Sequence, residues 1–206
     1  MIYLTQKVVA AIDCMRRFRF EPRLLTRALL CIAAIGLPEV EELPVTESAV
    51  PLVAAAMDCY PDDRRLQGAG LSAAAAASKN HATRVYKYLR RSILFASRKH
   101  ADSKTVQKNA CTVFERTGNL WKTPDGLIQT IELTQHFYQD SSVVTKACSA
   151  IKAMSKLFSD DLEGKLKPSH FERLVNLGEI MVDEEESLTN LCSTYAKMCS
   201  ASYSTL

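Results

Sequence analysis

A glycine-rich hexad and a serine–lysine pair are the two short motifs in this chain that could carry chemistry. Gly68-Ala-Gly70-Leu-Ser-Ala73 has the G-x-G-x-x-A spacing with which dinucleotide-binding turns present backbone N–H groups to a pyrophosphate. That chemistry needs a strand before the first glycine, whereas Pro61-Asp-Asp-Arg-Arg65 is a polar turn. Ser149 and Lys152 have a nucleophile-pair spacing, but no companion motif accompanies them. We therefore interpret the glycines as a site of close helix packing, and we predict no cofactor.

The histidines and cysteines also lack the sequence spacing that is typical of metal ligands or catalytic groups. The four histidines have no metal-ligand spacing, and the seven cysteines include no C-x-x-C pair, which predicts reduced thiols and no metal site. The cysteines are at positions 14, 31, 59, 111, 148, 192 and 199. The acidic residues cluster at turns, away from any general acid–base pair. We predict a protein without catalytic residues; an enzyme or small-molecule binder is the less favoured alternative, and it would need a pocket with convergent polar groups.

The amino-acid composition indicates the fold class, and so the type of secondary structure that positions the residues discussed above. Gly and Pro contribute 7 residues each to a chain of 206, about half the usual share, which disfavours turn-rich sandwiches and barrels. Hydrophobic residues make up 47% of the chain, enough for a packed core. The longest apolar run, Ala28 to Leu37, is far shorter than the ~20 residues of a bilayer span. These features predict an all-α protein with no membrane span.

Five segments of the chain align with one another over their better part. When Leu24, Leu66, Val106, Val143 and Ser187 are taken as position zero, successive copies are offset by 42, 40, 37 and 44 residues. A small or apolar residue recurs four positions on, in Ala28, Gly70, Ala110, Ala147 and Leu191. Six positions before zero stand Phe18, Tyr60, His100, Phe137 and Met181. A period of about 41 residues is typical of helical repeat proteins.

Within each copy, two groups of apolar residues have helical spacing and flank a polar turn. The turn always contains an acid three or four residues before position zero: Glu21, Asp62 with Asp63, Asp102, Asp140, and Asp183 with Glu184. An acid at this place can accept from the free N–H groups of the second helix and faces the positive end of its dipole. Each copy is therefore predicted to be a helix, a tight turn and a second helix.

The repeats predict one domain, residues 1–206, built as a right-handed α–α superhelix. The expected repeats cover residues 4–37, 46–79, 82–118, 123–158 and 167–201, with linkers at 36–48, 78–83, 117–126 and 159–169. His100 replaces an aromatic residue of the other copies and is predicted to be a packed side chain.

The segments Val106-Gln-Lys-Asn-Ala110-Cys111 and Val143-Val-Thr-Lys-Ala147-Cys148, together with the stretch from Met57 to Gln67, resemble the armadillo repeat and its relative, the HEAT repeat. The resemblance covers most of the chain and implies a solenoid that binds other proteins. Importin-alpha-type members resemble one another in a ladder of Trp and Asn for nuclear-localisation peptides. Here the Trp place holds Leu30, Ser72, Thr112, Ser149 and Ser193, and the Asn place holds Ala34, Ala76, Arg116, Ala153 and Lys197. Binding of nuclear-localisation peptides by an importin-alpha-type groove is therefore disfavoured. A groove lined by small hydroxyl-bearing residues is predicted.

Charge is strongly segregated, although the net charge is only +3. Nine Lys or Arg and one acid lie from Lys79 to Lys108, whereas Pro38 to Asp63 holds seven acids and no base. Here the predicted core stripe is Val85, Tyr88, Leu89, Ser92, Ile93 and Ala96, which places a basic ridge on a neighbouring face. The candidate partner-binding residues are Arg84, Lys87, Arg91, Arg98, Lys108, Ser72, Thr112, Arg116, Ser149 and Ser193. A solvated face, or pairing with the acidic segments, is the alternative interpretation of the ridge.

Taken together, these patterns predict a non-catalytic adaptor, scaffold or structural subunit of a multiprotein assembly, for example a cytoskeletal or ciliary one. Its partners are expected to be proteins with acidic surfaces, such as tubulin tails, or an extended or helical segment in the groove. A nucleic-acid-associated solenoid is the first alternative, disfavoured by few aromatics and a nearly balanced charge. The expected compartment is the cytoplasm. Five arginines in the first 27 residues suggest a mitochondrial presequence as the minor alternative, against which Asp13 and Glu21 argue.

Overall fold

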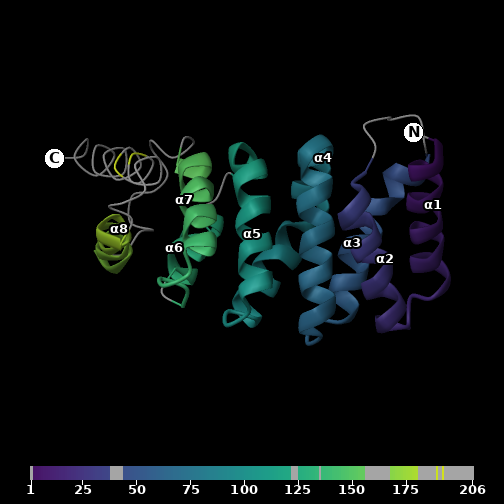
Figure 1. The fold of residues 1–206 in the computed structure, drawn as a ribbon, viewed down its shortest axis with the longest axis horizontal. Coiled ribbons are helices and arrows are strands. Elements are labelled where there is room, and N and C mark those ends of the chain that lie inside the picture. The colour runs from purple at the N-terminus through teal and green to yellow at the C-terminus, as the bar shows by residue number, and fades with distance from the viewer. Residues whose placement is uncertain are drawn as a thin grey trace. The chain divides into compact units, whose positions relative to one another are not determined.

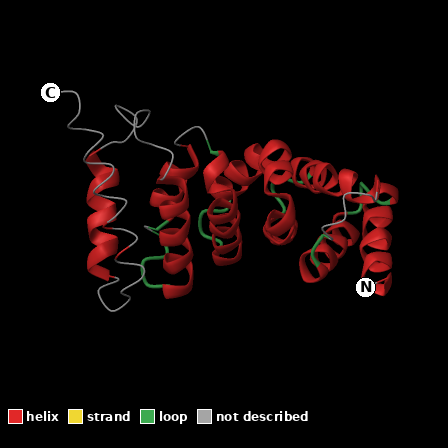
Figure 2. Cartoon of the chain, turned by 90° about the horizontal axis from the view of Figure 1, so that it is seen from above, coloured by secondary structure: helices red, strands yellow, loops and turns green. Residues whose placement is uncertain are grey.

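In the computed structural model, residues 2–37, 44–121, 125–134, 136–155 and 168–180 are described, together with positions 189 and 192. Every regular element in these ranges is a helix, as Figure 2 shows. The elements are α1 (Ile2–Arg17), α2 (Pro22–Ile35), α3 (Pro44–Cys59), α4 (Arg64–Lys99), α5 (Lys104–Thr117), the 3-10 turn η1 (Gly118–Leu120), α6 (Asp125–Leu133), α7 (Ser141–Ser155) and α8 (Pro168–Ile180). For this part of the chain, the prediction of an all-α protein is confirmed.

The chain folds as two compact units, residues Met1–Ala110 and Cys111–Leu206. In the first unit α1 packs against α2 and α3, and both α2 and α3 pack against α4 (Figure 1). The core between them is formed by fully buried aliphatic side chains, including Ile12, Leu29, Ile32, Leu66 and Leu71. These residues occupy the apolar stripes that the helical periodicity marks, so this unit is held together mainly by hydrophobic burial.

Helix α4 crosses the boundary that the sequence predicted between the second and third repeats. The expected linker at 78–83 is helical, which corrects that prediction. His81 alone has non-helical backbone angles, φ −128° and ψ 39°, so α4 is two helical segments joined at a kink. The side-chain amide of Asn80, beside the kink, donates to the carbonyl of Leu37 (3.2 Å) and ties it to the end of α2. The boundary predicted between the second and third repeats therefore corresponds to a kink within α4, and no loop separates the two helical segments.

Two buried glutamines make the same contact 40 residues apart. Gln67 Nε2 donates to the carbonyls of Met57 (2.7 Å) and Tyr60 (2.9 Å) at the end of α3. Gln107 Nε2 donates to the carbonyls of Ser97 (2.8 Å) and His100 (2.9 Å) at the end of α4. The last carbonyls of a helix lack intrahelical partners, so each glutamine caps the helix that precedes its own. The predicted 40-residue offset between these copies is therefore reproduced in hydrogen bonding.

The acids at the turns behave differently from one copy to the next. Asp63 accepts from the backbone N–H groups of Arg65 and Leu66 (both 3.0 Å), and Asp140 accepts from that of Val143 (3.3 Å). These two therefore cap their helices as predicted. Glu21 precedes α2 but makes no side-chain capping bond. A glutamate side chain is longer than those of the favoured capping residues, which explains why the prediction is wrong there.

The second unit is built around Trp121, which follows η1 and is 1% exposed. Its ring meets Phe114 edge-to-face with 5.1 Å between centroids, and its Nε1–H donates to Thr117 Oγ1 (2.9 Å). Helix α7 packs against η1 and α6, and α6 also contacts α8. At Gly118 the backbones approach so closely that a Cβ atom would lie 2.7 Å from that of Ala153. Only glycine fits there without displacing α7.

Candidate functional site

One face of α4, after the kink, presents bases and aromatic rings together to solvent. We call it the α4 basic–aromatic face, and it comprises Arg84, Lys87, Tyr88, Arg91, Phe95 and Arg98. These residues are three or four positions apart, which places them on one side of a helix. Lys87, Arg91 and Arg98 are exposed and Arg84 is half-buried. The opposite side carries the buried residues Val85, Leu89, Ser92, Ile93 and Ala96, as the sequence predicted.

Tyr88 belongs to this exposed face and not to the core stripe, which corrects the prediction. It is 43% exposed, and Phe95, one heptad on, is 50% exposed. Nearby cations cover both rings: Lys87 Nζ is 5.2 Å from the centroid of Tyr88, and Lys99 Nζ is 5.5 Å from that of Phe95. Cation–π attraction at such exposed sites contributes about 0.5–1 kcal/mol. The position of Tyr88 around the helix axis, and not the hydrophobicity of its ring, determines that this side chain is exposed.

Two ion pairs within the first unit involve residues of the basic segment, Lys99 and Asp102. Lys99 forms an ion pair with Asp62 of the acidic segment, and Arg64 contacts both carboxylate oxygens of Asp102 (2.6 and 2.8 Å). The hydrogen bond from Arg64 lowers the pKa of Asp102 below its ordinary value. The hydroxyl of Ser92 donates to the carboxylate of Asp58 (2.7 Å), so a third acid is also hydrogen-bonded within this unit. Asp58, Asp62 and Asp102 are thus engaged by Ser92, Lys99 and Arg64.

The remaining candidate residues are distributed between the two units. Ser72 Oγ accepts from the side-chain amide of Asn109 (2.6 Å), which also donates to the carbonyl of Gly68 (3.3 Å). This hydroxyl therefore joins α4 to α5 within the first unit. Lys108 is exposed on α5 in the same unit. Thr112, Arg116 and Ser149 are half-buried in the second unit, and Ser193 lies outside the described residues.

The motifs set aside on sequence grounds occupy structural positions. The hexad from Gly68 to Ala73 lies inside α4, and a Cβ atom at Gly70 would lie 2.6 Å from the Met57 side chain. Gly70 therefore permits close packing of α3 on α4, as predicted, whereas Gly68 faces Thr105 and Val106 of α5 at ordinary contact distances. His100 is buried, and its Nε2 lies 3.0 Å from the carbonyl of Pro61. Within the described ranges, no cluster of three or more His, Cys, Asp or Glu residues could hold a metal ion.

The capping glutamines are the residues that sequence reasoning missed. Both follow position zero directly, in Leu66-Gln67 and Val106-Gln107, so alignment of polar as well as apolar positions would have found them. The other copies carry Leu25, Val144 and Leu188 there. Because the glutamine occurs in only two of five copies, an apolar-pattern search had no reason to select it.

The cysteines differ sharply in environment, which predicts their reactivity. Burial raises the pKa of the Cys111 thiol far above its ordinary value, and the neighbouring Cys148, also buried, adds to the shift. Thiolates, not thiols, react with alkylating reagents. We expect Cys59 and Cys192, both exposed, to react with iodoacetamide in the native protein, and Cys111 and Cys148 to react only in denaturant. Peptide mapping by mass spectrometry measures this; native alkylation of Cys111 would contradict the packing of the second unit.

Comparison with known proteins adds no assignment. No protein-family model, no curated protein and no solved structure gives a significant match to this chain. Among the described helices, none is both long enough and apolar enough to cross a membrane. The function proposed below therefore depends on the geometry of the chain itself.

Proposed function

We propose that this chain is a non-catalytic protein–protein interaction module of armadillo/HEAT-like type, a right-handed superhelix of about five repeats acting as adaptor or structural subunit of a larger cytoplasmic assembly. The cytoskeleton and the cilium are examples of such assemblies. The observation that carries the proposal is the α4 basic–aromatic face, on which three bases and two aromatic rings are exposed together. Stacked helical repeats are general binding surfaces, which agrees with this role.

The repeat architecture is supported by contacts that recur at the predicted spacing. The caps formed by Gln67 and Gln107 make the same pair of hydrogen bonds at nearly the same distances and lie 40 residues apart. The kink at His81 falls between the second and third expected repeats. A solenoid forms when each helix pair buries its apolar face against the next pair. The capping glutamines fix how one helix follows another, which is what such stacking needs.

The chemistry of the face favours an acidic protein segment as partner. Arg84, Lys87, Arg91 and Arg98 provide cations along one line, and Tyr88 and Phe95 provide apolar area between them. Aromatic residues and arginine are the types enriched at protein interfaces, where they contribute most of the binding energy. An acidic segment with apolar residues at helical or extended spacing would satisfy both features. Glutamate-rich tails of cytoskeletal proteins have the required charge.

A nucleic-acid partner is the second candidate, and the exposed rings are the observation in its favour. Bases of single strands stack on aromatic side chains while cations follow the phosphates. Only two rings, Tyr88 and Phe95, are strongly exposed on this face of α4, so it offers stacking for few bases. The acidic protein partner therefore remains the preferred one.

Charge reversal on the face should abolish partner binding. For the double variant Lys87→Glu/Arg91→Glu we expect at least a tenfold loss of affinity, because both cations would become repulsive to an acidic partner. Affinity purification with identification of partners by mass spectrometry, followed by binding measurements with the recovered partner, provides the test. Arg23→Glu/Arg27→Glu is the matched control, since both residues are exposed on α2 and the change in net charge is the same.

Two outcomes would decide against this assignment. If nuclease treatment removes the recovered partners, and binding falls steeply with salt in proportion to the phosphates contacted, the nucleic-acid candidate is correct. If the reversal on α4 and the control on α2 weaken binding equally, only net charge matters and the face is not the binding site. Circular dichroism must show that all variants keep the helical content of the wild type.

A further inference from the structure

A pocket of about 330 Å³ opens in the first unit between α1, α2 and α3. Its wall is mainly apolar, from Met15, Leu25, Leu52, Ala55 and Ala56, and two arginines and an exposed thiol complete it: Arg16, Arg19 and Cys59. The volume lies within the range of natural ligand sites, which also combine apolar walls with a few polar groups. The pocket is far in sequence from the α4 basic–aromatic face, and the function proposed above makes no use of it.

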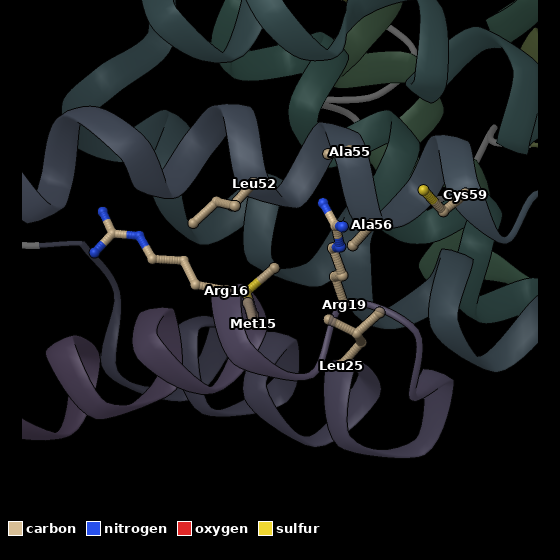
Figure 3. A pocket seen from close by; sticks show the side chains of 8 residues that line it. All are labelled: Met15, Arg16, Arg19, Leu25, Leu52, Ala55, Ala56 and Cys59. Carbon is tan, nitrogen blue, oxygen red and sulfur yellow. The ribbon is translucent and has the colours of Figure 1, made fainter.

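The two arginines are placed differently around the pocket. In Figure 3 the Arg19 guanidinium stands beside Ala55 and Ala56 of α3, whereas the Arg16 side chain extends away from them. Arg16 contacts the carboxylate of Asp13 at 3.4 Å, which offsets its charge. The described contacts of Arg19 are a cation–π contact with Phe20, with Cζ 4.6 Å from the centroid, and a carbonyl that accepts from Tyr60 at 3.5 Å. Arg19 is therefore the stronger positive group at the pocket.

We propose that this pocket binds an apolar monocarboxylate, a medium-length acyl chain with a free carboxylate, and that Arg19 recognises the carboxylate. The alkyl chain would lie mainly against Leu52 and Ala55, above the nearly buried Met15 and Leu25, and the guanidinium would donate to the carboxylate oxygens. No acidic side chain lines the pocket, so an anion meets no like charge there. A cation of the same length would gain the same apolar contacts and would be repelled by both arginines.

Each methylene that enters the pocket should contribute equally until the pocket is full. At about 0.8 kcal/mol per buried methylene, the dissociation constant should fall about fourfold for each added carbon. A series from hexanoate through octanoate to decanoate, measured by isothermal titration calorimetry with the full chain, should show this trend. Affinity that does not depend on chain length would contradict binding in an apolar pocket.

Cys59 provides a readout at the site itself. Decanoate should slow alkylation of Cys59 by N-ethylmaleimide, because the thiol lines the pocket. Cys192, exposed and in the second unit, is the internal control and should react at an unchanged rate. Decyltrimethylammonium and decanol test the headgroup at the same chain length. Equal protection by either of them would overturn recognition of a carboxylate, and no protection by decanoate would overturn the site.

Substitutions at the arginines test the contribution of positive charge to binding, and a substitution at Ala55 tests whether the ligand occupies the pocket. Arg19→Gln should weaken decanoate binding about tenfold, because it removes a charge-assisted hydrogen bond at a partly solvated position. Arg16→Gln should weaken it less, since Asp13 already offsets that charge. Ala55→Trp fills the pocket from an exposed position and should abolish binding without unfolding α3. If Ala55→Trp keeps wild-type affinity and wild-type helical content, the ligand is not in this pocket.

Discussion

Replacing Trp121 by alanine is expected to lower the free energy of unfolding of the second unit by about 3–5 kcal/mol. The side chain is 1% exposed, so alanine would leave a cavity, and the edge-to-face contact with Phe114 would be lost. The hydroxyl of Thr117 would lose the hydrogen bond that it accepts from the indole. Urea unfolding followed by far-UV circular dichroism measures the change, since Trp121 is the only tryptophan and its fluorescence disappears in the variant.

Two further variants show whether the loss comes from packing at this position. Trp121→Phe keeps a ring and loses the N–H donor, so a smaller loss of about 1–2 kcal/mol is expected. Tyr138→Ala removes an aromatic ring that is 51% exposed in the same unit and should change stability by less than ~0.5 kcal/mol. Equal effects of Trp121→Ala and Tyr138→Ala would show that the second unit is not built around the indole.

Replacement of Gln67 by methionine is expected to destabilise the first unit by about 1–3 kcal/mol. The carbonyl of Met57 cannot accept from the residue four positions on, because Pro61 has no N–H. Gln67 supplies that donor at 2.7 Å in a buried place, whereas the Tyr60 carbonyl also accepts from Asp63. Methionine keeps the length of the side chain, so the loss measures the missing hydrogen bond.

The equivalent change at Gln107 should be smaller, and the comparison tests the recurrence of the cap. Its Oε1 is buried and has no partner among the described residues, so removing it recovers part of the cost. Gln67→Glu should be worse than Gln67→Met, because a carboxylate cannot donate to two carbonyls. Gln6→Met, at an exposed position of α1, is the control. A loss at Gln67 no larger than that at Gln6 would show that the cap does not hold α3 and α4 together.

The sequence predicted the all-α architecture because helical periodicity and scarce turn residues are local properties of the chain. It placed the turns before α2, α4, α5 and α7 and interpreted the hexad from Gly68 to Ala73 correctly. The sequence-based prediction was wrong at Tyr88, where the local pattern is compatible with both a buried and an exposed side chain. Tyr88 fits an apolar stripe as well as an exposed one, and only the burial of Leu89 and Ile93 on the neighbouring line decides between them.

The sequence by itself thus determined the all-α character of the described residues, the 40-residue offset between Leu66-Gln67 and Val106-Gln107, and the basic segment. Only the tertiary structure decided that residues 78–83 continue a helix, that two glutamines cap the preceding helices, and that Tyr88 and Phe95 lie among the bases. It also brought Arg19 beside the apolar wall formed by Leu25 and Leu52. Periodicity reports which side of a helix is apolar, whereas a cap, a kink or a pocket depends on groups that only the packing of several helices brings within contact distance.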